Sequence, residues 1–220
     1  MRVISPFMHS LKEVHPQAAN RVPQYLKGSS RKNVLFKRSS RLVLEAYTNA
    51  DYVGYVIDRR STTRYWTFFC GNLVTWRSKK HSLVARSSAE AKFHAMSQGI
   101  CKLLWLKIIS KDLKIKWDKP MRLYCDNKSA ISIAHNPIRH NQTKHIEINI
   151  HFIKEKLDSG LTCTPYVSIN HQLADILTKS LSSIKFQASV SKLGMKHIYS
   201  PLKRECGRMK LGKSSFCKEN

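Results

Sequence analysis

Acidic residues are scarce in this chain. Its 220 residues include 14 Asp and Glu against 39 Lys and Arg, which gives a formal net charge of +25. Such an excess of positive charge, spread along the chain, suits a polyanionic partner, and nucleic acid is the first candidate. The alternative is that the charge only solvates the surface and serves no specific partner.

Paired cysteines and long apolar runs are missing as well. The cysteines at 70, 101, 125, 163, 206 and 217 form no close pairs. They predict reduced thiols in an intracellular protein, with Cys101 and Cys125 in the core, rather than disulfides. Histidines without paired cysteines or a His-x-x-x-His spacing do not indicate a zinc site.

No apolar run is long enough to span a bilayer, and charges return early, at Lys12 and Glu13. We therefore expect neither a membrane span nor secretion, and we expect a cytoplasmic or nuclear location.

Apolar residues make up 42% of the chain, enough for one sizeable domain with two appendages. Segment 1–41 contains an expected helix at 12–26, with Gly28 at its C-terminal stop, and a basic connector. Segment 42–200 carries the strand and helix patterns of the main domain. Segment 201–220 lacks apolar periodicity and is rich in Lys, Arg, Gly and Ser, which predicts a disordered tail.

The main domain begins with three strand-like stretches. "LVLEAYTNADYV" at 42–53 is rich in β-branched and aromatic residues, and "TRYWTFFC" at 63–70, "GN" and "LVTWRS" at 73–78 predict a hairpin. A long helix is expected from about Ser87 to Leu113, because Ser87 and Glu90 have the spacing of a capping box. The pattern indicates an antiparallel meander followed by a helix.

The second half alternates short strands with helices. "MRLYCDN" is a buried strand ending at Asp126, and two helical stretches follow, the second closed by Gly160. "LTCTPYVSI" at 161–169 is a predicted fifth strand, and Asn170 is the expected cap of a helix at 171–181. The order β-β-β-α-β-α-α-β-α predicts an α/β fold with a mixed five-stranded sheet flanked by helices. Ligand sites in such sheets form at strand carboxyl ends, where Asp126 lies.

Seven short blocks stand out along the chain: "DRRSTT" at 58–63, "WRSKK" at 76–80, "ARSSAEA" at 85–91, "YCDNKSAISIAHNP" at 124–137, "TKHIEI" at 143–148, "HFIKEKL" at 151–157 and "QLADILTK" at 172–179. In sequence and in order they resemble the signature blocks of one family, the ribonuclease H domain of copia-type retrotransposon Pol polyproteins. The stretch at 7–28 is similar to the reverse transcriptase tail and connection that precede this domain. The resemblance therefore covers residues 1 to about 200 and implies a ribonuclease H-like fold for 42–200.

The resemblance implies hydrolysis of the RNA strand in RNA–DNA hybrids by two Mg²⁺ ions held by four carboxylates. Asp126 and Asp175 match two of these metal-binding positions. The other two positions differ, because Asn49 stands where the family has an aspartate and Lys92 where it has a glutamate. Taken alone, Asp126 could begin a turn and Asp175 could favour a helix dipole.

Neighbouring acids are poor replacements. Glu90 is two residues from Lys92, roughly 160° around the helix, and already serves the capping box. Asp51 shares a strand face with Asn49 but lies about 7 Å further along the strand. An ammonium at position 92 repels a metal and can pair instead with Asp126 or Asp175, so we expect an inactive centre in a foldable domain.

Three alternatives stay open at this stage. The first is a basic module that binds RNA–DNA hybrid or duplex without cutting it. The second is an active nuclease with rearranged ligands, and the third is a chain without function, in which Arg64 between strands and Lys92 at a core edge each cost stability. A reverse transcriptase domain from a related element is a conceivable partner.

Overall fold

The computed structural model describes residues 32–39, 41–52, 59–81, 84–115, 119–136, 144–177 and 183–197, with isolated positions at 16, 19, 20, 23 and 27. The chain divides into two units, Val34–Met195 and a second that joins Met1–Asn33 to Lys196–Asn220. The fold and the site discussed below lie in the first unit. The tail predicted at 201–220 and most of the helix predicted at 12–26 lie outside the described residues.

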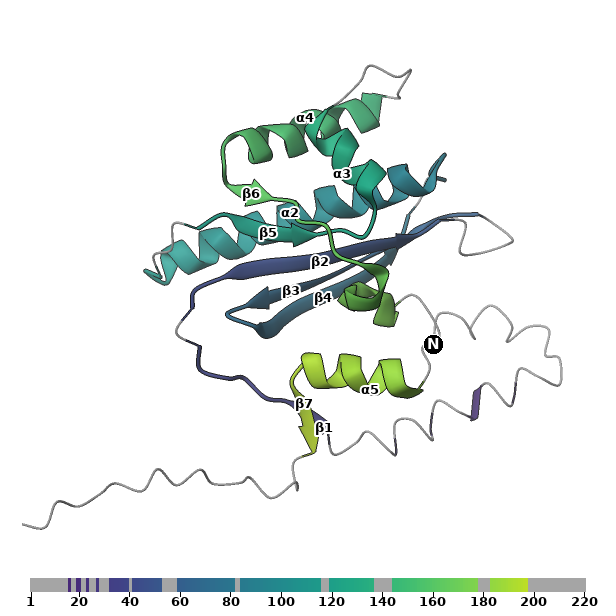
Figure 1. Ribbon diagram of the computed structural model, residues 1–220, viewed down its shortest axis with the longest axis vertical. Helices are drawn as coiled ribbons and strands as arrows, with labels where there is room; N and C mark the ends of the chain where they lie inside the picture. The colour runs from purple at the N-terminus through teal and green to yellow at the C-terminus, as the bar shows by residue number, and fades with distance from the viewer. Residues whose placement is uncertain are drawn as a thin grey trace, which may run out of the picture. The chain divides into compact units, whose positions relative to one another are not determined.

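A mixed five-stranded sheet organises the first unit, with strands in the order β4-β3-β2-β5-β6 (Figure 1). Strands β2, β3 and β4 form the antiparallel meander, and β5 runs parallel to both β2 and β6. This arrangement confirms the predicted α/β fold with helices on the sheet. The strands are β1 (Lys32–Val34), β2 (Leu44–Asp51), β3 (Thr62–Phe69), β4 (Asn72–Lys80), β5 (Met121–Tyr124), β6 (Thr162–Cys163) and β7 (Met195–His197), of which β1 and β7 form a separate two-stranded sheet.

Helices cover both faces of the sheet. Helices α2, α3 and α4 lie on one face, and the 3₁₀ segment η3 and helix α5 lie on the other (Figure 1). Each face has its own apolar cluster, one built around α2 and the other around Trp66, Phe68 and Leu173. The helical elements are α2 (Ser88–Asp112), α3 (Lys128–His135), α4 (Lys144–Asp158), η2 (Ile169–His171), η3 (Leu173–Leu177) and α5 (Ser183–Lys192). Within the described ranges, no helix is long and apolar enough to cross a membrane.

Helix α2 begins where the sequence predicts. The Ser87 hydroxyl accepts a hydrogen bond from the Glu90 backbone N–H at 3.0 Å, which satisfies one of the free donors of the first turn. The Glu90 carboxylate accepts from the Arg86 N–H at 2.7 Å, one residue earlier than in a standard capping box. Both bonds fix the start of the helix and hold Glu90 at its outer end.

The hairpin turn lies one residue earlier than predicted. Cys70 and Gly71 form the turn, with φ of 54° and 76°, and Asn72 already belongs to β4. Two consecutive positive φ values match the twist of the flanking strands. Cysteine rarely takes this conformation, so the sequence pattern favoured Gly71 and Asn72 instead.

The fifth strand is shorter than the predicted stretch at 161–169. Strand β6 holds only Thr162 and Cys163, and pairing resumes as a single bridge between Cys125 and Tyr166. Pro165 lies between the two paired segments and has no N–H to donate to a ladder. The proline therefore limits β6 to a fragment at the sheet edge.

The helix predicted at 171–181 is replaced, in its described part, by two 3₁₀ segments, and Asn170 lies inside η2 rather than capping a helix. The side chain of Gln172 donates to the Thr48 carbonyl at 3.0 Å. The Asp175 carboxylate accepts from the side-chain amide of Asn49, which lies next to Thr48 on β2. Residues three apart align on one side of a 3₁₀ turn, which lets both side chains reach β2. Helix α5 was not predicted.

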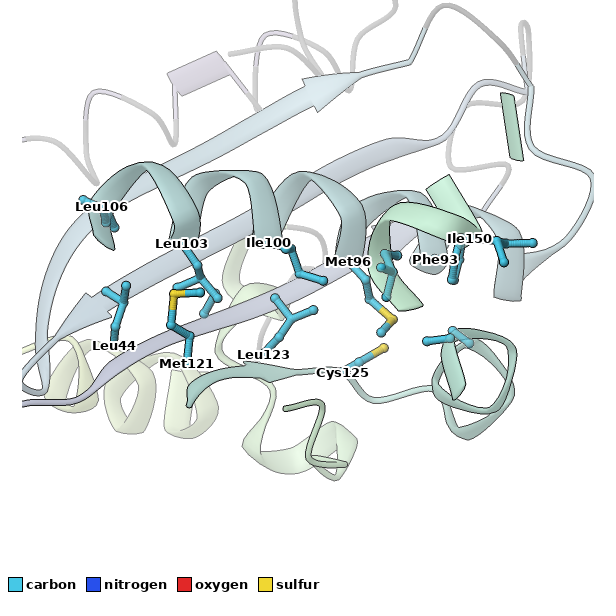
Figure 2. Packing of buried hydrophobic residues seen from close by; sticks show 14 residues of the cluster. Leu44, Phe93, Met96, Ile100, Leu103, Leu106, Met121, Leu123, Cys125 and Ile150 are labelled. Atoms are coloured by element: carbon cyan, nitrogen blue, oxygen red, sulfur yellow. The ribbon is translucent and has the colours of Figure 1, made fainter. Parts of the chain in front are cut away.

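The cysteine prediction holds for one of its two core residues. Cys125 is fully buried between α2 and the sheet, and burial raises the pKa of its thiol to about 11 (Figure 2). Cys101 is exposed on α2, because it lies on the side of the helix away from Ile100 and Leu103. Cys101 is therefore a surface thiol.

Gly99 sets how closely α2 approaches the sheet. A Cβ at this position would meet Thr48 Cγ2 at 2.5 Å and Leu123 Cδ1 at 2.7 Å. Helix propensity alone makes a Gly to Ala change favourable by about 1 kcal/mol, whereas overpacking costs about 1–3 kcal/mol. We expect Gly99→Ala to lower the free energy of unfolding by about 1 kcal/mol in urea denaturation. Gln98→Ala, at the neighbouring position, is the control, and a more stable Gly99→Ala variant would contradict this packing.

Candidate active site

The carboxyl ends of β2 and β5 bring the central site positions to one level of the sheet. Tyr47 on β2 is the register partner of Tyr124 on β5, and the Thr48 hydroxyl donates to the Tyr124 carbonyl at 3.3 Å. Asn49 and Asp126 each follow two residues after this register pair. Because parallel neighbours stay in step, these two residues lie beside each other where the strands end.

Asn49 and Asp175 form one buried pair. The Asn49 side-chain amide nitrogen donates to Asp175 Oδ1, and the Asn49 amide oxygen accepts from the Ala50 N–H at 2.8 Å. Only 3% of Asn49 and 6% of Asp175 are exposed. The pair therefore joins β2 to η3 through a hydrogen bond to a buried carboxylate.

Lys92 and Asp126 form a second pair. Lys92 Nζ lies 2.7 Å from Asp126 Oδ1, with 15% of the lysine side chain and 1% of the aspartate side chain exposed. Lys92 is in the second turn of α2, which places the ammonium over the carboxyl end of β5. A carboxylate so deeply buried requires a compensating charge, and the Lys92 ammonium supplies it.

These contacts do not fit a two-magnesium centre. Mg²⁺ binds oxygen ligands at about 2.1 Å. Asp126 already contacts an ammonium, and Asp175 already contacts an amide nitrogen. Throughout the described part of the chain, no group of three or more His, Cys, Asp or Glu side chains is placed to hold a metal ion. Both carboxylates therefore accept hydrogen bonds from protein side chains, Asp126 from Lys92 and Asp175 from Asn49.

Asp51 is also engaged. Its carboxylate accepts from the Thr62 N–H and lies 3.4 Å from the Arg64 guanidinium. Arg64 is the cross-strand partner of Asn49, and its Nε donates to the Ser78 hydroxyl at 3.2 Å. Arg64 thus has partners on both neighbouring strands, and Asp51 is held at the end of β2 by contacts to β3.

Glu90 points away from the two pairs. Its carboxylate bonds the Arg86 N–H and lies 3.8 Å from His94 Nε2, one helical turn further along α2. Lys92, two residues later, reaches Asp126 instead. The structure therefore brings Asn49 to Asp175 and Lys92 to Asp126, and it leaves Glu90 and Asp51 with other partners.

Gln172 is the residue that sequence reasoning missed. Its amide nitrogen bonds the Thr48 carbonyl, and its amide oxygen accepts from the Ala174 N–H at 3.2 Å. These bonds fasten η3 to β2 directly beside Asn49. The available signal was the spacing of three residues between Gln172 and Asp175, which places both side chains on one side of a 3₁₀ turn.

The strand order and the placement of the helices are those of a ribonuclease H-like α/β fold. No family model matches the chain. The chain is 36% identical over 195 residues to the retrovirus-related Pol polyprotein from transposon RE1 of Arabidopsis thaliana, an alignment that covers 89% of this chain and 13% of that protein. It is 33% identical over 193 residues to the Pol polyprotein from transposon TNT 1-94 of Nicotiana tabacum, covering 88% and 14%. Both relatives are Pol polyproteins of plant retrotransposons.

The chain spans only 13–14% of the length of these two Pol relatives. Among solved structures, the N-terminal ribonuclease H domain of rv2228c from Mycobacterium tuberculosis aligns with a TM-score of 0.44 and 8% identity, over 69% of this chain and 98% of that chain.

Proposed function

We propose that this chain is the C-terminal ribonuclease H domain of a copia-type Pol polyprotein, in which the catalytic centre has been lost. Its ancestral activity is hydrolysis of RNA in RNA–DNA hybrids with two Mg²⁺ ions. The observation that carries the proposal is the 2.7 Å contact between Lys92 Nζ and Asp126 Oδ1. On this proposal the Lys92 ammonium takes the place of the divalent metal that the family's chemistry would need beside Asp126.

Electrostatics favours the inactive reading over a rearranged enzyme. Two unit charges about 4 Å apart interact by roughly 4 kcal/mol at an effective dielectric of 20, so an ammonium in place of a carboxylate replaces attraction of a metal by repulsion of similar size. Asn49 removes one more negative charge. Asp51, already paired with Arg64, and Glu90, already bonded at the N-terminus of α2, do not restore it.

We expect the natural chain to give no Mg²⁺-dependent or Mn²⁺-dependent product from an RNA–DNA hybrid labelled on the RNA strand. The Asp126→Asn variant is the background control, because it removes the carboxylate that pairs with Lys92. Product from the natural chain that disappears in Asp126→Asn would mean that a rearranged metal site works, and it would overturn the proposed loss of activity.

A second candidate function is hybrid or duplex binding without cleavage. The net charge of +25 supports it, because phosphate contacts depend on positive charge rather than on a catalytic centre. We expect hybrid affinity to fall steeply between about 50 and 200 mM salt, by at least tenfold, while the hybrid stays intact. Fluorescence anisotropy with a labelled hybrid measures this, and salt-independent affinity would exclude phosphate contacts as its source.

The remaining assignments follow from the family resemblance. We place the reverse transcriptase remnant at 1–41, the ribonuclease H domain at 42–200 and a basic tail at 201–220, in an intracellular chain of the cytoplasm or nucleus. A reverse transcriptase domain from a related element is the proposed protein partner. Mg²⁺ is the ancestral cofactor.

A further inference from the structure

A basic groove lies between the middle turns of α2 and the strands β3 and β4. It is an open depression of about 270 Å³. Tyr65 and Arg77 are cross-strand partners in its floor, and α2 supplies one wall. We call it the α2–β4 groove, and its lining residues are Tyr65, Arg77, Lys79, Gln98, Cys101, Lys102 and Trp105.

Positive charge in the α2–β4 groove is not balanced by acids. Arg77, Lys79 and Lys102 line it, no Asp or Glu does, and none of the three forms an ion pair with a described carboxylate. Burial and the neighbouring Arg77 both lower the pKa of Lys102. An anion bound between these cations would relieve their mutual repulsion.

An aromatic ring accompanies the cations. Lys102 Nζ lies 3.3 Å from the centroid of the Trp105 ring, and 48% of Trp105 is exposed. An exposed indole beside cations is the combination with which proteins hold unpaired bases, because every base has a face that can stack on a ring. A base within a duplex does not offer that face.

The groove is separate from the buried pairs of the active-site region. Lys92 and Lys102 are ten positions apart on α2, about 15 Å along a helix axis. Asn49 pairs in register with Arg64, whereas Tyr65, the next residue, faces the opposite side of the sheet towards α2. Ligand binding in the groove therefore does not require the metal-binding positions.

We propose that the α2–β4 groove binds single-stranded nucleic acid. Arg77, Lys79 and Lys102 contact consecutive phosphates, and Lys102 moves off Trp105 so that a base stacks on the indole. The proposal does not depend on whether the ribonuclease H centre is active. Its ligand is a strand, and an isolated phosphate ion lacks the base that the indole would hold.

Cys101 provides the readout, because this exposed thiol lines the groove, and Cys163 on β6 is an exposed thiol outside it. Burial raises the pKa of both thiols, so both react with iodoacetamide through a minor thiolate fraction at pH 8. With a saturating twelve-residue oligothymidylate, we expect alkylation of Cys101 to slow at least fivefold and that of Cys163 to stay unchanged. Mass spectrometry of the peptides measures the two rates in the full chain.

Two pairs of substitutions on the full chain test the residues. The double variant Arg77→Gln, Lys102→Gln should lose the protection of Cys101, whereas the charge-matched Lys107→Gln, Lys111→Gln, on the same helix but outside the groove, should keep it. Equal protection by inorganic phosphate at the same phosphate concentration and ionic strength would overturn the proposal of a strand. An unprotected Cys101 with bound oligonucleotide would overturn the groove itself. Neither outcome involves cleavage, so both are distinct from failure of the proposed function.

Discussion

The double variant Asn49→Asp, Lys92→Glu is expected to hydrolyse the RNA strand of an RNA–DNA hybrid in Mg²⁺ at least a thousandfold faster than the natural chain. Exchanging the Lys92 ammonium for a carboxylate reverses an interaction of roughly 4 kcal/mol with a nearby metal, and each 1.4 kcal/mol is about tenfold in rate. The Asn49→Asp change adds a further carboxylate beside Asp126 and Asp175. Gel analysis of a hybrid labelled on its RNA strand gives the rates.

The control is the triple variant that also carries Asp126→Asn, which should return to background. Without metal, the double variant gathers four carboxylates and loses the Lys92 pair, so it should be less stable than the natural chain. Millimolar Mg²⁺ should raise its Tm and leave that of the natural chain unchanged, because only a ligand that binds the folded state stabilises it. A double variant that binds Mg²⁺ in this way yet cuts no faster than the triple variant would show that the four positions are not the catalytic set.

Lys92→Met is expected to destabilise the domain by about 3–5 kcal/mol, because it leaves a buried carboxylate without its counter-charge. Asp126 is the buried member, with 1% of its side chain exposed, so water cannot replace the ammonium. Urea denaturation at pH 7 measures the change. Lys111→Met, at an exposed position in the last turn of the same helix, should stay within about 0.5 kcal/mol.

A second variant separates the effect of the charge from the effect of packing. Asp126→Asn combined with Lys92→Met removes both charges, and this double variant should recover most of the stability lost in Lys92→Met alone. A loss below about 1 kcal/mol in Lys92→Met would mean that the pair is solvated, as exposed ion pairs are. Equal losses in the single and double variants would assign the effect to the lysine stem.

Short sequence patterns correctly predicted those helices and strands whose ends are fixed by residues close by in the chain. Helix α2 begins at its capping serine, and the meander follows the alternation of apolar residues. Contacts distant in sequence decided the segment at 171–181, where the predicted helix is replaced in its described part by 3₁₀ turns. Gln172 and Asp175 form 3₁₀ turns because both bond β2, more than 120 residues away, which no local pattern contains. Strand β6, by contrast, is shortened by Pro165, a signal that was present in the local sequence.

The site follows the same division. The family resemblance indicated that Asn49, Lys92, Asp126 and Asp175 belong together, and two partners were open for the lysine. Which carboxylate it contacts depends on the position of α2 over β5, fixed by the packing of Met96, Ile100 and Leu103 against Leu123 and Cys125 (Figure 2). That packing arises from the whole sheet, so the pairing of Lys92 with Asp126 required the structure.

The Lys92–Asp126 contact gives the domain a built-in counter-ion. On the proposed function, an ancestor that balanced its carboxylates with divalent ions would have had a stability that varied with the metal supply, whereas the Lys92–Asp126 pair keeps the same charge balance in the presence of a chelator. The same pair would make the proposed loss of activity hard to reverse. A single change at position 92 removes the stabilising pair before a complete set of ligands exists, so a return to activity would pass through a less stable domain.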